Sequence, residues 1–246
     1  MTRTQLTEDG AAVVATLARP AQGLTLVAER RRLLVALLAA TLASLAVAAV
    51  AVPRLDFERA AAARLDHGPE GADMTPHQRE EALVQARKVG TLSSYAGAVG
   101  GPALMVAGAA LFLWAGFKVA GTRPDLRGSA AVAAHGMLPI FLGQLLVIPA
   151  LVARAPVAVE ELPRLLPSSA AAFLPAGASP VLAAALGSLD VFGLWAAVLV
   201  AAGMARVAGA TRLRAAAVTG VLWLAQVAML KVVPAALAAQ GRHGGP

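Results

Sequence analysis

The stretch that decides the fold is residues 189–234, which read LDVFGLWAAVLVAAGMARVAGATRLRAAAVTGVLWLAQVAMLKVVP. It holds two apolar runs of about twenty residues, the length that a helix needs to cross ~30 Å of bilayer hydrocarbon. The short turn between the runs carries Arg206, Arg212 and Arg214 and no acidic residue. The pattern predicts two membrane-spanning helices joined by a basic turn.

The composition of the whole chain places it in the same class. The 246 residues are 58% hydrophobic and 14% charged, whereas roughly a quarter of the residues in soluble domains are charged. Alanine and leucine dominate, which favours helices over the short alternating strands of a barrel. We therefore expect an all-α, polytopic integral membrane protein, a helical bundle of about five transmembrane helices. The absence of cysteine excludes disulfides and thiolate chemistry.

Further apolar runs extend this organisation towards the N-terminus. The expected spans are residues 33–52, 95–119, 130–153, 190–208 and 215–236. Together they form a membrane domain over residues 33–237, which lies between a cytoplasmic segment over residues 1–32 and a tail over residues 238–246.

The segments outside the spans carry weaker signals. Residues 21–32, AQGLTLVAERRR, predict an interfacial helix that an arginine cluster anchors on anionic lipid, with an uncommitted tail as the alternative. Thr75, Pro76 and Gln78 predict a capped helix over residues 75–88, as a cover on the outer face. Residues 155–188 fit a surface loop, a re-entrant helix or an extra span.

The charge distribution predicts the orientation. The net charge of +7 is a possible signature of nucleic-acid binding, but basic cytoplasmic loops explain it better. The N-terminal segment and the loops at 118–127 and 206–214 hold 11 basic and four acidic residues, against six and seven in residues 53–94. We expect a membrane protein with its N-terminus in the cytoplasm and its C-terminus outside, and no nucleic-acid partner.

Glycines in the second span predict close helix packing. Gly97 and Gly101 form a GxxxG step, and small residues let two helices approach closely in lipid. Packing within the chain is the first interpretation and self-association the second.

Ionisable residues inside a membrane are costly and are candidate functional sites. Asp190 begins the fourth span, and Lys231 lies near the same end of the fifth. We predict an ion pair between them, as a structural clamp or as a proton or cation site. The alternative is that Asp190 caps its helix and that Lys231 extends to the interface.

Three further polar residues lie within the spans. Gln144 and Gln226 are near mid-membrane, where they can bond across helices or line a polar cavity. His135 stands without a neighbouring carboxylate or cysteine, so we expect a packed histidine and no metal. No residue pattern indicates a cofactor.

Several short motifs resemble those of a known family. They are RPAQGLTLVAERRR at 19–32, MTPHQ at 74–78, HGMLP at 135–139 and LDVFGLW at 189–195, with a basic turn before the last span. The chain resembles the bacterial branch of the Yip family of integral membrane domains. Eukaryotic members of that family are multispanning proteins that contact Rab-type GTPases. Their tyrosine- and glycine-containing signature is not evident here, so we do not expect GTPase contact.

The resemblance implies no catalytic residues, and the sequence shows no HExxH, no GxSxG and no second intramembrane aspartate. We expect a protein that is not an enzyme: a membrane organiser or adaptor whose partners are lipid, other membrane proteins or a second copy. The alternative is a small transporter or channel that uses Asp190, Lys231 and the other polar residues of the spans.

Overall fold

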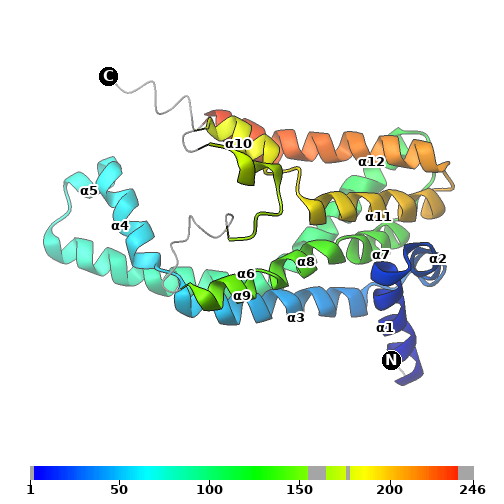
Figure 1. Cartoon of the computed structure of the whole chain (residues 1–246), viewed down its shortest axis with the longest axis horizontal. Coiled ribbons are helices and arrows are strands. Elements are labelled where there is room, and N and C mark those ends of the chain that lie inside the picture. The colour runs from blue at the N-terminus through cyan, green and yellow to red at the C-terminus, as the bar shows by residue number, and fades with distance from the viewer. Residues whose placement is uncertain (1–2, 155–164, 176–177, 238–246) are drawn as a thin grey trace. The chain divides into compact units, whose positions relative to one another are not determined.

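The computed structural model describes residues 3–154, 165–175 and 178–237 (Figure 1). The predicted tail over residues 238–246, and residues 155–164 of the predicted loop, lie outside the described residues. The described residues are mostly helical, with short turns between the helices and an isolated β-bridge between Ser169 and Asp190. The α-helices are α1 (Arg3–Ala18), α2 (Pro20–Arg30), α3 (Leu34–Ala51), α4 (Phe57–His67), α5 (Pro69–Ala72), α6 (Pro76–Val119), α7 (Leu126–Gly136), α8 (Leu138–Leu145), α9 (Ile148–Ala153), α10 (Pro180–Leu186), α11 (Val191–Val207) and α12 (Arg212–Val227).

The described residues include four helical stretches that are long and apolar enough to cross a membrane. They are Leu34–Arg54, Pro76–Val119, Leu126–Ala153 and Arg212–Leu237. The all-α membrane class is therefore confirmed. The remaining predicted span is α11, an apolar helix of 17 residues, at the lower limit of about 17–25 residues for a spanning helix. Its crossing of the bilayer, and with it the count of five spans, stays a prediction.

Helix α6 differs from the sequence prediction. We expected one helix over residues 75–88 and a separate span over residues 95–119, but Pro76–Val119 is one helix of 44 residues. The residues between the two predicted helices hold no proline, and the hydroxyls of Ser93 and Ser94 bond back to the Gly90 carbonyl. A lone glycine costs a helix only about 1 kcal/mol, so nothing stops the helix there. At ~1.5 Å per residue α6 is about 66 Å long, far more than the hydrocarbon core.

The predicted third span is divided into α7, α8 and α9. The second and third of these helices each begin one residue before a proline, Pro139 or Pro149. Proline has no backbone N–H and its ring clashes with a preceding turn of helix, but it is tolerated in a first turn. The two prolines therefore set both breaks.

Two compact units make up the chain, and each is described by itself. Unit 1 comprises Met1–Ala40, Ala103–Leu142 and Pro167–Pro246, and unit 2 comprises Thr41–Pro102 and Gly143–Leu166.

The core of unit 1 is built around α7. Its residues Ala131 to Ala134 are at most 1% exposed, and it packs against α2 and α11. Glycines let α7 and α11 approach closely: a Cβ at Gly136 would lie 2.6 Å from a Val200 side-chain atom, and one at Gly203 would lie 2.7 Å from Val132. These are the tight small-residue contacts of the fold.

Gly97 and Gly101, for which we predicted such packing, do not take part in it. A Cβ at either position would meet no atom within 4 Å. Their role in helix packing, within the chain or between two copies, stays a prediction.

Unit 2 contains α4 packed on the first part of α6. A Cβ at Gly90 would lie 2.5 Å from the Phe57 ring, so the glycine makes room for that ring. Arg79 forms an ion pair with Asp66. The predicted capping box is confirmed: Thr75 N donates to Gln78 Oε1 (2.9 Å), and Gln78 N donates to Thr75 Oγ1 (3.3 Å).

Candidate functional site

A cavity of about 310 Å³ lies in unit 1 beside α11 and α12, which run side by side (Figure 1). We call it the α11–α12 cavity. Its polar lining residues are Ser188, Asp190, Thr219, Gln226 and Lys231, and its apolar walls include Phe112, Leu113, Leu222, Trp223 and Leu230. The structure thus brings together three of the five polar residues that the sequence singled out: Asp190, Gln226 and Lys231.

The Asp190 carboxylate is divided between two environments. Its Oδ2 accepts a hydrogen bond from Gly193 N at 2.9 Å, which caps the N-terminus of α11. Its Oδ1 is buried and has no hydrogen-bond partner. A carboxylate oxygen is an acceptor only, so Oδ1 presents an unused acceptor at the cavity.

The structure does not contain the predicted ion pair between Asp190 and Lys231, because no nitrogen–oxygen distance of 4.0 Å or less joins them in the described chain, and the pair stays a prediction. The capping bond fixes the carboxylate at the start of α11, where the positive end of the helix dipole already stabilises it. Lys231 is exposed at the same cavity. Two opposite charges therefore line one cavity without neutralising each other.

Thr219 is a polar residue of the cavity that sequence reasoning missed. It is 6% exposed, and its Oγ1 has no hydrogen-bond partner. Threonines in helices commonly donate to the carbonyl four residues earlier, as Thr16 does to Ala12 at 2.8 Å. One threonine among apolar residues gives no periodic signal, so only the tertiary structure distinguishes Thr219.

The helix that carries Lys231 changes form beside the cavity. Residues Ala228–Val232 are π-helical, directly after α12, and both Leu230 and Lys231 of this segment line the cavity. Single-turn π-helical segments are rare and occur frequently at functional sites.

The other two predicted polar residues lie elsewhere. His135 is 3% exposed, and its Nδ1 lies 3.0 Å from the Ala131 carbonyl, as expected for a packed histidine. Gln144 accepts a hydrogen bond from Ser44 of α3 at 3.5 Å. Gln144 belongs to unit 2 and Gln226 to unit 1, so a bond between the two stays a prediction.

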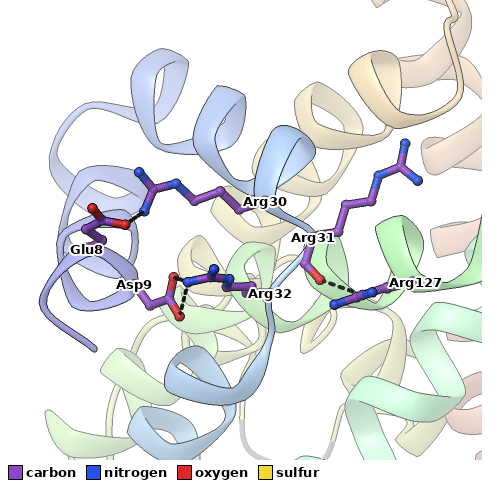
Figure 2. Close-up of polar contacts among 6 residues, drawn as sticks. All are labelled: Glu8, Asp9, Arg30, Arg31, Arg32 and Arg127. Atoms are coloured by element: carbon purple, nitrogen blue, oxygen red, sulfur yellow. Dashed lines mark hydrogen bonds and ion pairs between the residues drawn. The ribbon is translucent and has the colours of Figure 1, made fainter. Parts of the chain in front are cut away.

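A second polar grouping joins the N-terminal helices (Figure 2). Arg30 pairs with Glu8 at 2.9 Å, and Arg32 pairs with Asp9 at 3.3 Å. The Asp9 side chain is only 6% exposed. We call these four residues the N-terminal charge cluster; it ties the end of α2 to α1.

Arg31, between the two arginines of this cluster, also has an acidic partner. It has the left-handed backbone conformation that ends α2, with φ 51°, and its side chain lies 3.1 Å from Asp125. Its carbonyl accepts a hydrogen bond from Arg127 Nε at 3.3 Å (Figure 2). The arginines that we expected to contact anionic lipid are thus each paired within the protein.

The apolar face of α2 is covered by protein. Leu24 and Val27 are 1% and 2% exposed, and the helix packs on α7 and α11. Arg206 also donates to the Ala21 carbonyl at 3.3 Å. The place of α2 at a membrane surface stays a prediction.

Comparison with known families agrees with this arrangement. The model of the Yip1 domain matches residues 14–233. The chain belongs to the Yip1-domain family. The match confirms the family resemblance and, with the apolar helices, makes the chain an integral membrane protein. Comparison with curated proteins and with solved structures gives no match.

The matched region includes all of one polar grouping and part of the other. It contains every residue named in the α11–α12 cavity and the arginines of the charge cluster, whereas Glu8 and Asp9 precede it. Among the described residues of the domain, no three or more His, Cys, Asp or Glu side chains form a group that could hold a metal.

Proposed function

We propose that this Yip1-domain protein is a non-catalytic membrane organiser or adaptor, which holds other membrane proteins or a second copy of itself beside its helices. It acts in the inner membrane of a bacterium, with its N-terminus in the cytoplasm and its C-terminus outside. The excess of basic residues in the N-terminal segment and in two loops supports this orientation.

The observation that carries the proposal is the open glycine step of α6. At Gly97 and Gly101 no atom would lie within 4 Å of an added Cβ. Ser93, four residues before Gly97 and thus on the same helix face, is exposed and lies in the same unit. Helices in lipid associate through small residues that let their backbones approach closely, so this face suits a partner helix.

The chain offers little apparatus for catalysis. It has no cysteine, and Asp190 is committed by one oxygen to capping α11. A hydrolytic site needs a nucleophile beside a base that is itself oriented by a third group. The polar residues described here support binding rather than chemistry.

Crosslinking in the native membrane tests the organiser role. A photo-crosslinking side chain at position 93 should capture a partner helix, either of this chain or of another membrane protein. The double substitution Gly97→Ile and Gly101→Ile should reduce capture to background, because branched side chains hold the helices apart.

Gly220→Ile is the matched control for this experiment. Gly220 lies in α12, and a Cβ there would also meet nothing within 4 Å, so the control adds the same bulk to an open helix face elsewhere. Capture should survive this change. Equal capture by the wild type and the double variant would overturn the proposal, as would an absence of any captured partner.

A small transporter or channel is the second candidate function. The specific observation in its favour is that Asp190, Gln226 and Lys231 line one cavity. Flux into proteoliposomes, followed with pH- and cation-sensitive dyes, should then disappear in Asp190→Asn and in Lys231→Met while both proteins remain folded. Flux no greater than in empty liposomes would favour the organiser.

A further inference from the structure

The α11–α12 cavity contains two charges that have no ionic partner among the described residues. Asp190 Oδ1 is buried without a hydrogen bond, and Lys231 forms no ion pair within the described chain, although both residues line the same cavity. A buried acceptor without a donor has lost its hydrogen bonds to water and gained none in return, which is unfavourable. A ligand that brings a donor to Asp190 would remove this cost.

The two charges together define the headgroup of such a ligand. The Asp190 carboxylate can accept a hydrogen bond from a cationic N–H donor, and the Lys231 ammonium can pair with an anion. A molecule that carries only one of these charges would leave the other residue without a partner. A zwitterion with an ammonium and a phosphate complements both, and charge-assisted hydrogen bonds are the stronger ones.

The rest of the cavity indicates a lipid rather than a small polar molecule. Most of the other lining residues are apolar, among them Phe112, Leu113, Leu222, Trp223 and Leu230. Only 6% of the apolar window of Arg212–Leu237 is buried inside the protein, so the helix that borders the cavity faces the acyl chains of the bilayer. The walls therefore suit an acyl chain.

Gln226 continues the polar side of the cavity towards the membrane interior. It precedes Lys231 by five residues, about 7.5 Å along a helix axis, and its amide can donate to a carbonyl. A glycerophospholipid carries ester carbonyls between its headgroup and its chains, at the depth where such a donor is useful.

We propose that the α11–α12 cavity binds a membrane lipid with a phosphoethanolamine headgroup. The primary ammonium donates to Asp190 Oδ1, the phosphate pairs with Lys231, and an acyl chain lies along the apolar wall. The π-helical segment Ala228–Val232, which carries Lys231, is the part of the helix that positions the anion-binding side chain.

This binding mode predicts a selectivity. A phosphocholine headgroup has the same charges, but its quaternary nitrogen has no N–H and cannot donate to Asp190. We expect the ethanolamine lipid to bind at least ten-fold more tightly than a choline lipid with identical acyl chains. The inference concerns the same cavity as the transporter hypothesis but requires binding only.

Native mass spectrometry of the detergent-solubilised full chain measures this selectivity directly. The protein is titrated with ethanolamine and choline lipids of matched chains, and with free phosphoethanolamine. Asp190→Asn should abolish the preference, and because asparagine is as good an N-cap as aspartate, α11 should remain capped. Lys231→Met should weaken the binding of both lipids, because it removes the side chain that pairs with the phosphate.

Two matched control substitutions test whether a change in lipid binding comes from the cavity residues themselves or from any similar substitution in the chain. Asp56 also caps a helix, accepting from Arg59 N at 2.8 Å, and lies in unit 2, so Asp56→Asn should leave the preference unchanged. Lys118 lies 4.2 Å from the Trp114 ring centroid and is not a lining residue of the cavity, so Lys118→Met is the control for Lys231→Met.

Each outcome bears on the inference. Equal affinity for the two lipids, a preference that persists in Asp190→Asn, or free phosphoethanolamine that binds as tightly as the lipid would each overturn it. If Asp190→Asn fails to fold, the lipid preference of the wild type and the weaker lipid binding of Lys231→Met still test the inference. The double variant at Gly97 and Gly101 should retain the preference, so failure of the organiser role and failure of lipid binding are distinguishable.

Discussion

The two polar groupings of unit 1 differ in whether their charged side chains are paired. In the N-terminal charge cluster, Asp9 is almost fully buried and pairs with Arg32, and Glu8 pairs with Arg30. In the α11–α12 cavity, Asp190 keeps a buried oxygen without a partner, and Lys231 forms no ion pair with any residue that the structure describes. The first grouping is complete without a ligand, and the second is not.

The difference also appears in the packing around each grouping. In α2, a Cβ at Gly23 would lie 2.3 Å from the Thr16 backbone nitrogen, whereas in α12 a Cβ at Gly220 would meet nothing within 4 Å. Closed packing with paired charges is the arrangement of a structural joint. Open packing with unpaired charges is the arrangement of a binding site.

The largest expected loss of stability is for a substitution at the tight contact between α2 and α1. Gly23→Ala places a methyl group against the backbone of α1, which cannot move away as a flexible side chain can. We expect the free energy of unfolding to fall by about 3 kcal/mol, at the upper end of typical overpacking costs. Thermal unfolding in detergent measures this. Gly220→Ala should be neutral or stabilising by up to about 1 kcal/mol, and equal losses in both variants would contradict the comparison.

A smaller effect should follow from breaking the buried pair. Arg32→Met leaves the Asp9 carboxylate buried without its partner, but Arg32 is 36% exposed, so water can replace part of the lost interaction. We expect a loss of about 2 kcal/mol, below the 3–5 kcal/mol of fully buried pairs. In the exposed pair, Arg30→Met should cost less than about 1 kcal/mol. Equal shifts in the unfolding temperature of Arg32→Met and Arg30→Met would show that the burial of Asp9 does not make its ion pair more important for stability.

The smallest effect is expected at the cavity. Lys231 has no ionic partner, so Lys231→Met should change the free energy of unfolding by no more than about 0.5 kcal/mol. Thermal unfolding without added lipid is the measurement. A loss of 2 kcal/mol or more would mean that Lys231 and Asp190 form in solution the ion pair that is absent here, and the contrast between the two groupings would disappear.

Much of the fold could be predicted from local sequence. The apolar runs predicted the all-α membrane class, and Thr75 with Gln78 predicted a capping box that the structure contains. These features depend on residues close together in the chain. The continuity of α6 through residues 88–95 was missed because a helix may pass a glycine and two serines when nothing in the sequence forces it to end.

The candidate site was predictable in part. Charges inside apolar runs are conspicuous, so Asp190, Lys231 and Gln226 could be selected from sequence, and they line one cavity. Thr219 could not be selected, because a threonine is unremarkable until its surroundings are known. The contacts of Gly136 and Gly203 were missed for a similar reason: many glycines occur in this chain, and only packing distinguishes those that allow close contact between helices.

The sequence by itself determined that this protein is a helical membrane protein of the Yip1-domain family and where most of its helices lie. Hydrophobic length, prolines and capping residues act over a few turns of helix and can be read in order along the chain. The tertiary structure decided which charges are paired. Arg32 pairs with Asp9 and Arg31 pairs with Asp125, although the partners lie far apart in the sequence. Asp190 and Lys231 do not pair. Charge pairing depends on distances between side chains, and only the packing of the helices sets these distances.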